Sequence, residues 1–314
     1  MRKMQKMLVT VALSFALLPG LANSASPKKD YRFVMVPKVV HPWFEEVLDG
    51  MKDAGKMIEE QTGSKVTIDY QAPQHADVVE QNSIVERAIA TKPDGIVIDL
   101  LDEKGNRAVL DEALAHGIPI TIFDSVPPAG MPLTGIGNDF CEQAQIASER
   151  LVKLLDGKGE VAIMRGFPTA PNHLIRAKCH EQVFAKYPGI KLVAEGIDND
   201  DIGTAQSQAA AIMQAHPDLK GWVECDAAGP IGVGHAIQEA GKVGKVLEVG
   251  LDDLKDMLQL IKDGVADSSS STRPQMQGYW STIVMWQTAL GVKTPKTIDT
   301  GIAIITKDNL TTYK

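Results

Sequence analysis

Cysteine, aromatic residues and excess positive charge are all scarce in this sequence of 314 residues. The three cysteines, Cys141, Cys179 and Cys225, are too few and too far apart for a disulfide framework, and they lack the spacing of a zinc site. At most one disulfide can form, and buried thiols are the favoured interpretation. With 32 basic against 40 acidic residues, the net charge of -8 gives no electrostatic reason to bind nucleic acid or anionic lipid.

The motifs of common enzymes on α/β folds are also missing. The sequence has no G-x-S-x-G elbow, no phosphate-binding P-loop and no G-x-G-x-x-G after the first predicted strand. We therefore expect a protein that is not an enzyme, with no catalytic residues and no cofactor. His173 and His180 lie seven apart on one predicted helix without a third ligand at suitable spacing, so no metal site is expected either.

The first 24 residues have the pattern of a cleavable export signal. A basic start precedes an apolar run over 7–22, and Ala-Asn-Ser at 22–24 supplies small residues for cleavage. A membrane anchor is the alternative, but the run contains Pro19 and Gly20 and no charged stop-transfer segment follows. We predict secretion to the periplasm, and losing the three positive charges of the signal changes the net charge from -8 to -11.

Beyond Tyr31, short β-rich runs alternate with longer amphipathic stretches, which predicts α/β architecture with parallel sheets covered on both faces. A hydrophobic content of 44% supports a sizeable core. A Pro-rich break at 126–132 divides the pattern into two similar halves, so we expect two doubly wound lobes with a cleft between them. The predicted strands cover 31–37, 66–72, 95–101 and 119–125 in the first half, and 133–139, 160–166, 190–196, 221–226 and 245–253 in the second.

Polar and aromatic side chains follow the first predicted strand, where ligands of such sheets collect. Lys38 and His41 come first, and Pro42 then suits the first turn of a helix whose free N–H groups can receive a ligand oxygen. Trp43 is expected to face the cleft, because an indole stacks on a sugar ring and still donates a hydrogen bond. Phe44 either packs the helix onto the sheet or joins that wall.

Asp102, Asp124, Asp226 and Asp252 follow four other strands at comparable positions. Any one alone reads as a helix cap or turn residue, but four in facing halves favour a binding role. In the second half, Asn172 and Arg176 stand one turn apart at the start of a predicted helix. Carboxylates, a guanidinium and an amide together suit a neutral polyhydroxylated ligand, whose hydroxyls both donate and accept.

Several longer segments carry a family resemblance. They are RAKCHEQVFAKYPGIKLV (176–193), AAAIMQAHPDLKGWVECDAAGPIGVGHAIQEAG (209–241) and VLEVGLDD (246–253), with KPDGIVI (92–98) and HGIPITIFDS (116–125) in the first half. The sequence resembles the periplasmic sugar-binding proteins of the ribose-binding and lac-repressor-core type, which are solute receptors of ABC importers. The resemblance covers nearly all of the mature chain.

The resemblance implies roles for individual residues. Trp43 and Phe44 match aromatics that sandwich the sugar ring, and Asp102, Arg176 and Asp252 match polar ligand-binding positions. Thr272 and Arg273 fall where the chain of that family recrosses the hinge and offers a polar side chain to ligand. It also implies crossings near 125–127, 272–274 and 303–306, hence one lobe of 27–125 plus 274–303 and another of 126–273 plus 304–314.

This sequence departs from the ribose type at several positions. Cys225 and His41 stand where that type has Asn, and Cys179-His180 replace Gly-Phe, so ribose is not the expected ligand. The segments VPKVV, YQAP and FPTAPN look closer to the autoinducer-2 and rhamnose branch, although Asn172-His173 replaces the Asp-Gln pair of the autoinducer receptors.

The expected function is capture of a small sugar or polyol by a monomeric periplasmic receptor that delivers it to the permease of an ABC importer. The alternative is a sensor that presents autoinducer-2 or a sugar to a chemoreceptor or sensor kinase. A lac-repressor-type regulator is not expected, because no basic helix-turn-helix precedes the core.

Overall fold

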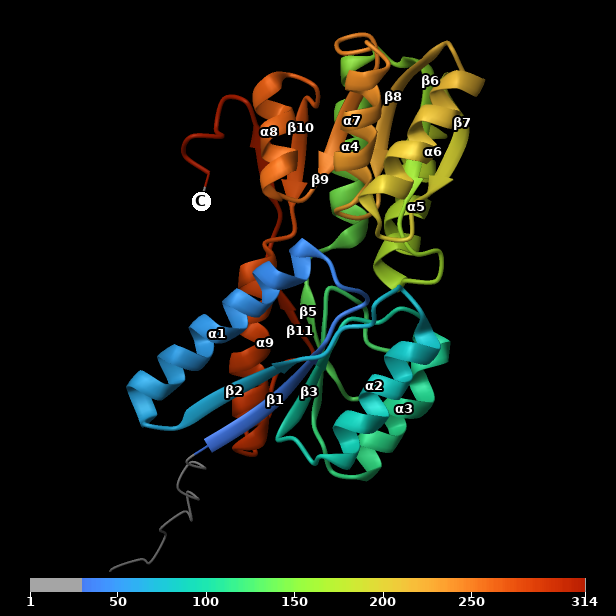
Figure 1. The fold of residues 1–314 in the computed structure, drawn as a ribbon. Helices are drawn as coiled ribbons and strands as arrows, with labels where there is room; N and C mark the ends of the chain where they lie inside the picture. Colours follow the sequence, from blue (N-terminus) through green and yellow to red (C-terminus); the bar gives the residue numbers. More distant parts are fainter. Residues whose placement is uncertain (1–29, 314) are drawn as a thin grey trace, which may run out of the picture.

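The computed structural model describes residues 30–313, so the predicted export signal lies outside the described residues. Figure 1 shows two α/β lobes, one above the other, joined by several passages of the chain. This arrangement confirms the predicted fold class. No helix within 30–313 is long and apolar enough to cross a membrane.

The first lobe is built on a parallel six-stranded sheet. Its strands are β1 (Asp30–Val36), β2 (Lys65–Tyr70), β3 (Gly95–Ile98), β4 (Ile120–Phe123), β5 (Thr134–Gly137) and β11 (Thr297–Asp299), in the order β11-β5-β4-β3-β1-β2. On one face lie α2 (Val78–Ala90) and α3 (Glu103–Ala115), and on the other α1 (Pro42–Thr62) and α9 (Pro274–Ala289). Burial on both faces explains the almost uninterrupted apolar runs of β3 and β4.

The second lobe repeats this plan. Its strands are β6 (Lys158–Arg165), β7 (Gly189–Ile197), β8 (Leu219–Glu224), β9 (Leu247–Leu251), β10 (Ser268–Ser271) and β12 (Ala303–Thr306), in the order β12-β10-β9-β8-β6-β7, and β12 runs antiparallel to β10. The helices are α4 (Phe140–Leu154) and α5 (Pro171–Phe184) on one face, and α6 (Ile202–Ala215), α7 (Gly229–Glu239) and α8 (Lys255–Asp263) on the other.

Sheet pairing corrects the predicted lobe boundaries at one strand. The predicted division puts residues 126–273 in the second lobe, but β5 pairs in parallel with β4 and with β11 of the first sheet. The first crossing therefore follows β5 instead of preceding it. After α9 the chain forms β11 in the first sheet and then β12 in the second.

Two glycines let α1 and α9 cross closely beneath the hinge. A Cβ added at Gly50 would lie 1.9 Å from the carbonyl oxygen of Gln275, and one at Gly278 would lie 1.9 Å from that of Val47. Neither distance is compatible with a side chain, so both positions need glycine. The close crossing fixes the start of α9 against the first lobe at the point where the chain returns from the second.

The cysteines do not all remain thiols. Cys141 of α4 and Cys179 of α5 form a disulfide, with their Cα atoms 5.4 Å apart. The interpretation of three buried thiols is therefore wrong for this pair, because spacing in the sequence does not show which helices pack together. Cys225 alone stays a buried free thiol.

Candidate ligand-binding cavity between the lobes

A cavity lies between the lobes, at the carboxyl ends of the strands of both sheets. Its free volume is about 30 Å³, so the walls contributed by the two lobes lie close together. The first lobe contributes Lys38, His41, Trp43, Phe44 and Asp124, and the second contributes His173, Arg176, Asp200, Asp226, Ala227, Ala228 and Asp252.

The first turn of α1 supplies an aromatic wall. His41 caps this helix, because its Nδ1 accepts a hydrogen bond from the backbone N–H of Trp43 at 3.2 Å. The indole of Trp43 stacks on Phe123 at 6.5 Å and meets Phe44 edge to face at 5.2 Å. The indole N–H donates to Thr272 Oγ1 at 3.2 Å, so this donor is used at the hinge, while the ring lines the cavity.

Lys38 joins the two lobes. Its ammonium lies 3.2 Å from Asp99 in its own lobe, and it reaches Asn172 Oδ1 at 3.3 Å and His173 Nε2 at 3.1 Å in the other. Burial alone would lower the pKa of Lys38, but Asp99 and Asp200 raise it above its ordinary value. The lysine therefore carries a full charge at the cavity wall.

Arg176 is held by its surroundings yet keeps one free donor. Its Nε donates to Gln143 Oε1 and its Nη1 to the carbonyl of Cys225, both at 3.0 Å. The guanidinium also lies 4.8 Å above the ring of Phe140. Nη2 is buried without a hydrogen-bond partner and lies 3.8 Å from Asp124, so it is available to a ligand in the cavity.

Two carboxylates occupy equivalent left-handed positions in the two lobes. Asp124 after β4 has φ 42° and Asp252 after β9 has φ 65°. Asp124 accepts from Asn172 Nδ2 at 2.8 Å across the cleft. Asp252 accepts from the backbone N–H of Thr272 at 3.1 Å. Burial raises the pKa of Asp252 to about 7, although the nearby Arg176 works against that shift.

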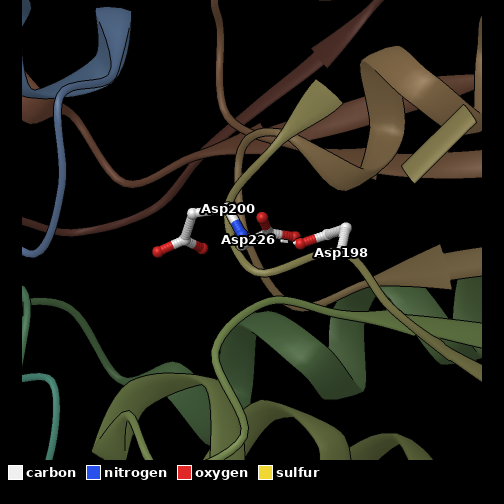
Figure 2. A group of neighbouring side chains, drawn as sticks. All are labelled: Asp198, Asp200 and Asp226. Atoms are coloured by element: carbon white, nitrogen blue, oxygen red, sulfur yellow. Dashed lines mark hydrogen bonds between the residues drawn. The ribbon is translucent and has the colours of Figure 1, made fainter. Parts of the chain in front are cut away.

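Three carboxyl groups of the second lobe meet at the cavity, and two of them, Asp200 and Asp226, line it. Figure 2 shows Asp198 and Asp200, from the loop after β7, close to Asp226, which follows β8. One oxygen of each lies within 4.8 Å of the others, and within 30–313 they form one group with spacing that a metal ion could use. Burial raises the pKa of Asp198 and of Asp226 well above the usual range, so both favour the protonated form.

Asp200 differs from these two neighbours. Burial acts to raise its pKa, but His173 and Lys38 hold that pKa below its ordinary value. Its side chain is 8% exposed, and Oδ2 is buried without a hydrogen-bond partner. Asp200 therefore presents to the cavity a charged carboxylate, one oxygen of which has no hydrogen-bond partner in the protein.

Comparison with known proteins agrees with this architecture. A family model described as a periplasmic binding protein domain matches residues 32–293. The chain belongs to this family. Among curated relatives of this periplasmic binding protein, the xylose/arabinose-binding protein of Sulfolobus acidocaldarius is 25% identical and aligns over 94% of this chain and 76% of its own. The D-ribose/D-allose-binding protein of Pseudomonas aeruginosa is 26% identical over 84% and 83%.

Solved structures give the same result in three dimensions. A solute-binding protein of an ABC transporter from Burkholderia graminis, in complex with D-arabinose, has a TM-score of 0.84 and 31% identity, covering 91% of this chain and 98% of its own. A glucose-galactose binding protein from Geobacillus stearothermophilus has a TM-score of 0.82 and 26% identity, covering 90% and 99%.

The structure of this binding protein brings most of the predicted site residues together. Eight line the cavity: Lys38, His41, Trp43, Phe44, Asp124, Arg176, Asp226 and Asp252. Asn172 and Thr272 lie directly behind the wall. Asn172 is hydrogen-bonded to Lys38 and Asp124. Thr272 is hydrogen-bonded to Trp43 and Asp252.

Two predicted residues are placed elsewhere. Asp102 caps α3 by accepting from the backbone N–H groups of Lys104 and Gly105, so the cap interpretation holds for it. Asp99, three residues earlier, is the carboxyl at that strand end that faces Lys38. Arg273 begins α9 with φ 55° and lines a separate groove on the hinge side.

Sequence reasoning missed other lining residues. Asp200 follows a strand in the same way as the four predicted aspartates, and applying the same rule to the Asp-Asn-Asp-Asp run at 198–201 would have found it. His173 is considered from the sequence only as a metal ligand, but it lines the cavity, is 3% exposed and accepts a hydrogen bond from the backbone N–H of Phe167 at its Nδ1. Ala227 and Ala228 have no polar or aromatic group that would mark them in the sequence as binding residues.

Proposed function

We propose that this periplasmic binding protein captures a small sugar or polyol between its lobes and delivers it to the permease of an ABC importer. The observation that carries the proposal is a small cavity whose wall combines aromatic ring faces with buried polar atoms from both lobes. Arg176 Nη2 and Asp200 Oδ2 lack hydrogen-bond partners in the protein, and ligand hydroxyls can supply both. Relatives named as import binding proteins for D-apiose support the transport role over a sensor.

The proposed mechanism is closure of two hinged lobes on the ligand. Ligand contacts from both lobes stabilise the closed form relative to an open one, which gives the permease a form to recognise. Binding without turnover is proposed because the relatives are named as binding proteins. The disulfide Cys141–Cys179 suits an oxidising compartment such as the periplasm.

A thermal-shift screen of pentoses, hexoses, polyols and sugar acids tests this function. A ligand present at 100 times its dissociation constant adds about 2.7 kcal/mol to the free energy of unfolding. Replacing Arg176 by Ala is then expected to cost about 2–4 kcal/mol of binding free energy, because a desolvated charged donor is lost from the wall.

The matched control is Arg150→Ala, which removes an arginine paired with Asp267 at the surface of the same lobe. Calorimetry on both variants, with circular dichroism as a check of folding, separates the site from general effects. Unchanged sugar affinity in a folded Arg176→Ala variant, or no stabilising ligand in the screen, would contradict the proposal.

A further inference from the structure

The disulfide lies beside the groups that hold Arg176 at the cavity wall. In the first turn of α4, Phe140 and Gln143 contact the guanidinium, and Cys141 stands between them in the sequence. On α5, Cys179 follows Arg176 by three residues, a spacing that puts both side chains on the helix face toward α4. The bond therefore joins the two segments whose contact fixes the position of Arg176.

This bond is the covalent link among otherwise non-covalent contacts. The start of α5 has no side-chain cap, and the first turn of α4 directly follows the first crossing between the lobes. Hydrogen bonds tie Gln143 to β10 and Arg176 to the carbonyl of Cys225. Further along the two helices, Ser148 Oγ lies 2.6 Å from Nδ1 of His180. Loss of the bond should therefore loosen the segments around Arg176 while the rest of the lobe stays folded.

A thiol can reach the disulfide from one side. Cys141 is partly exposed and lines a groove with a free volume of about 440 Å³, to which both lobes contribute residues. Cys179 is 6% exposed and Cys225 is fully buried. Because thiol–disulfide exchange depends on access to a sulfur atom, an exchanging thiol meets Cys141 first.

We propose that the Cys141–Cys179 disulfide is a redox switch of ligand binding, with high affinity when the bond is formed and low affinity when both cysteines are thiols. The inference rests on the proposed function, because it concerns the affinity of the same cavity. To form the bond, the two thiols lose two electrons and two protons, and the disulfide of a protein oxidant takes them up to become a dithiol. The exported chain therefore binds its ligand tightly only after this step.

Calorimetry on the full mature protein, oxidised or reduced with tris(2-carboxyethyl)phosphine, tests the switch. The probes are D-arabinose, D-xylose and every sugar that stabilises the oxidised protein in the thermal-shift screen. Reduction should weaken binding about tenfold or more, and reoxidation should restore it. The matched control is Cys141→Ser/Cys179→Ser, which should bind as weakly as the reduced wild type and should not respond to the reductant.

Arg176→Ala shows whether the bond acts through this side chain. If it does, reduction should change the affinity of this variant by less than about twofold, because the two changes are not additive. Hydrogen exchange gives a readout that needs no sugar. On reduction, the backbone N–H groups of 171–180 should exchange faster, whereas those of β6 and β8 should keep their protection.

Three results would overturn the inference and leave the proposed function standing. They are equal affinity in the two redox states, the same loss on reduction in Arg176→Ala as in the wild type, and unchanged hydrogen exchange over 171–180. If no sugar binds the oxidised protein, the proposed function fails, and the inference fails with it.

Discussion

At the scale of single residues, the hinge is controlled by carboxylates in unusual backbone positions. Asp124 and Asp252 end equivalent strands of the two sheets in the left-handed region, which aspartate tolerates better than most residues. The strain lets each side chain turn back toward the hinge, where Gln277 and Thr272 bind them. Each lobe therefore uses an aspartate in the left-handed conformation to direct a buried carboxyl group toward the hinge.

The buried position of Asp252 predicts a dependence of stability on pH. Its pKa in the fold is about 7, above the ordinary value of 3.8, because burial disfavours the charged form. The folded protein then holds a proton that the unfolded chain has released, so the free energy of unfolding falls as pH rises toward 7. Asn cannot titrate, and Asp252→Asn should gain up to about 1.4 kcal/mol per pH unit relative to the wild type over this window.

Urea unfolding of the ligand-free proteins at pH 5, 6, 7 and 8 measures this difference. The control is Asp49→Asn, which changes an exposed carboxylate paired with Lys52 on α1. The gain should already be present at pH 5, because the carboxyl of the unfolded chain ionises above its ordinary pKa of 3.8, and it should grow up to about pH 7 and level off above that. Parallel pH profiles for Asp252→Asn and the wild type would show that the carboxyl titrates normally.

Residue types alone predict much of the site. They fail where the backbone conformation decides whether a side chain faces the cleft or caps a helix. Lys38, Trp43 and Arg176 were predicted because they are unexpected at strand ends or helix starts. Asp102 looked the same as Asp124 in the sequence, yet the first caps a helix and the second faces the cleft. The distinction depends on where the strand stops and how the next helix begins, and β3 ends at Ile98, earlier than predicted.

At the scale of elements, α5 carries much of the second lobe's share of the site. Asn172, His173 and Arg176 all lie in its first two turns, and the helix has no side-chain cap at its start. The disulfide joins its later part to α4, where Cys141 sits in the first turn. The covalent link therefore holds the helix that presents Arg176 to the cavity.

Removing the disulfide should lower stability and loosen this helix. The bond closes a loop with a sequence separation of 38 residues, for which chain entropy gives about 2–4 kcal/mol. The paired variant Cys141→Ser/Cys179→Ser should lose about that amount in urea unfolding. The wild type in reducing agent should fall to the same value, whereas the variant should not respond. Titration of three free thiols in the unreduced protein would contradict the assignment.

The positions of the strands and helices could be predicted where each element has a clear hydrophobic pattern of its own. Most strands and helices appear within a few residues of their predicted ends, because parallel buried strands are apolar throughout. β10 is four serines and has no strand signal, so it forms only because β9 and β12 pair with it on both sides. The placement of β5 depends on its pairing with β4 and β11, and local sequence carries no information about that.

At the scale of the whole molecule, the two lobes touch directly as well as through the cavity. Thr169, in the loop before α5, donates to the carbonyl of Leu101 in the first lobe at 2.9 Å. Neither residue lines the cavity. Such a contact exists only when the lobes are closed, so it should add to the stability of the liganded form without touching the ligand.

Thr169→Val tests whether closure and ligand affinity are coupled in this way. The change keeps the shape of an exposed side chain and removes one hydrogen bond worth about 1 kcal/mol, so ligand affinity should fall roughly fivefold through faster dissociation. The free energy of unfolding of the ligand-free protein should change little. Ser207→Ala, which removes a hydroxyl bonded within α6, serves as the control and should leave affinity intact. Equal dissociation rates for Thr169→Val and the wild type in stopped-flow measurements would mean that the contact between the lobes does not stabilise the liganded state.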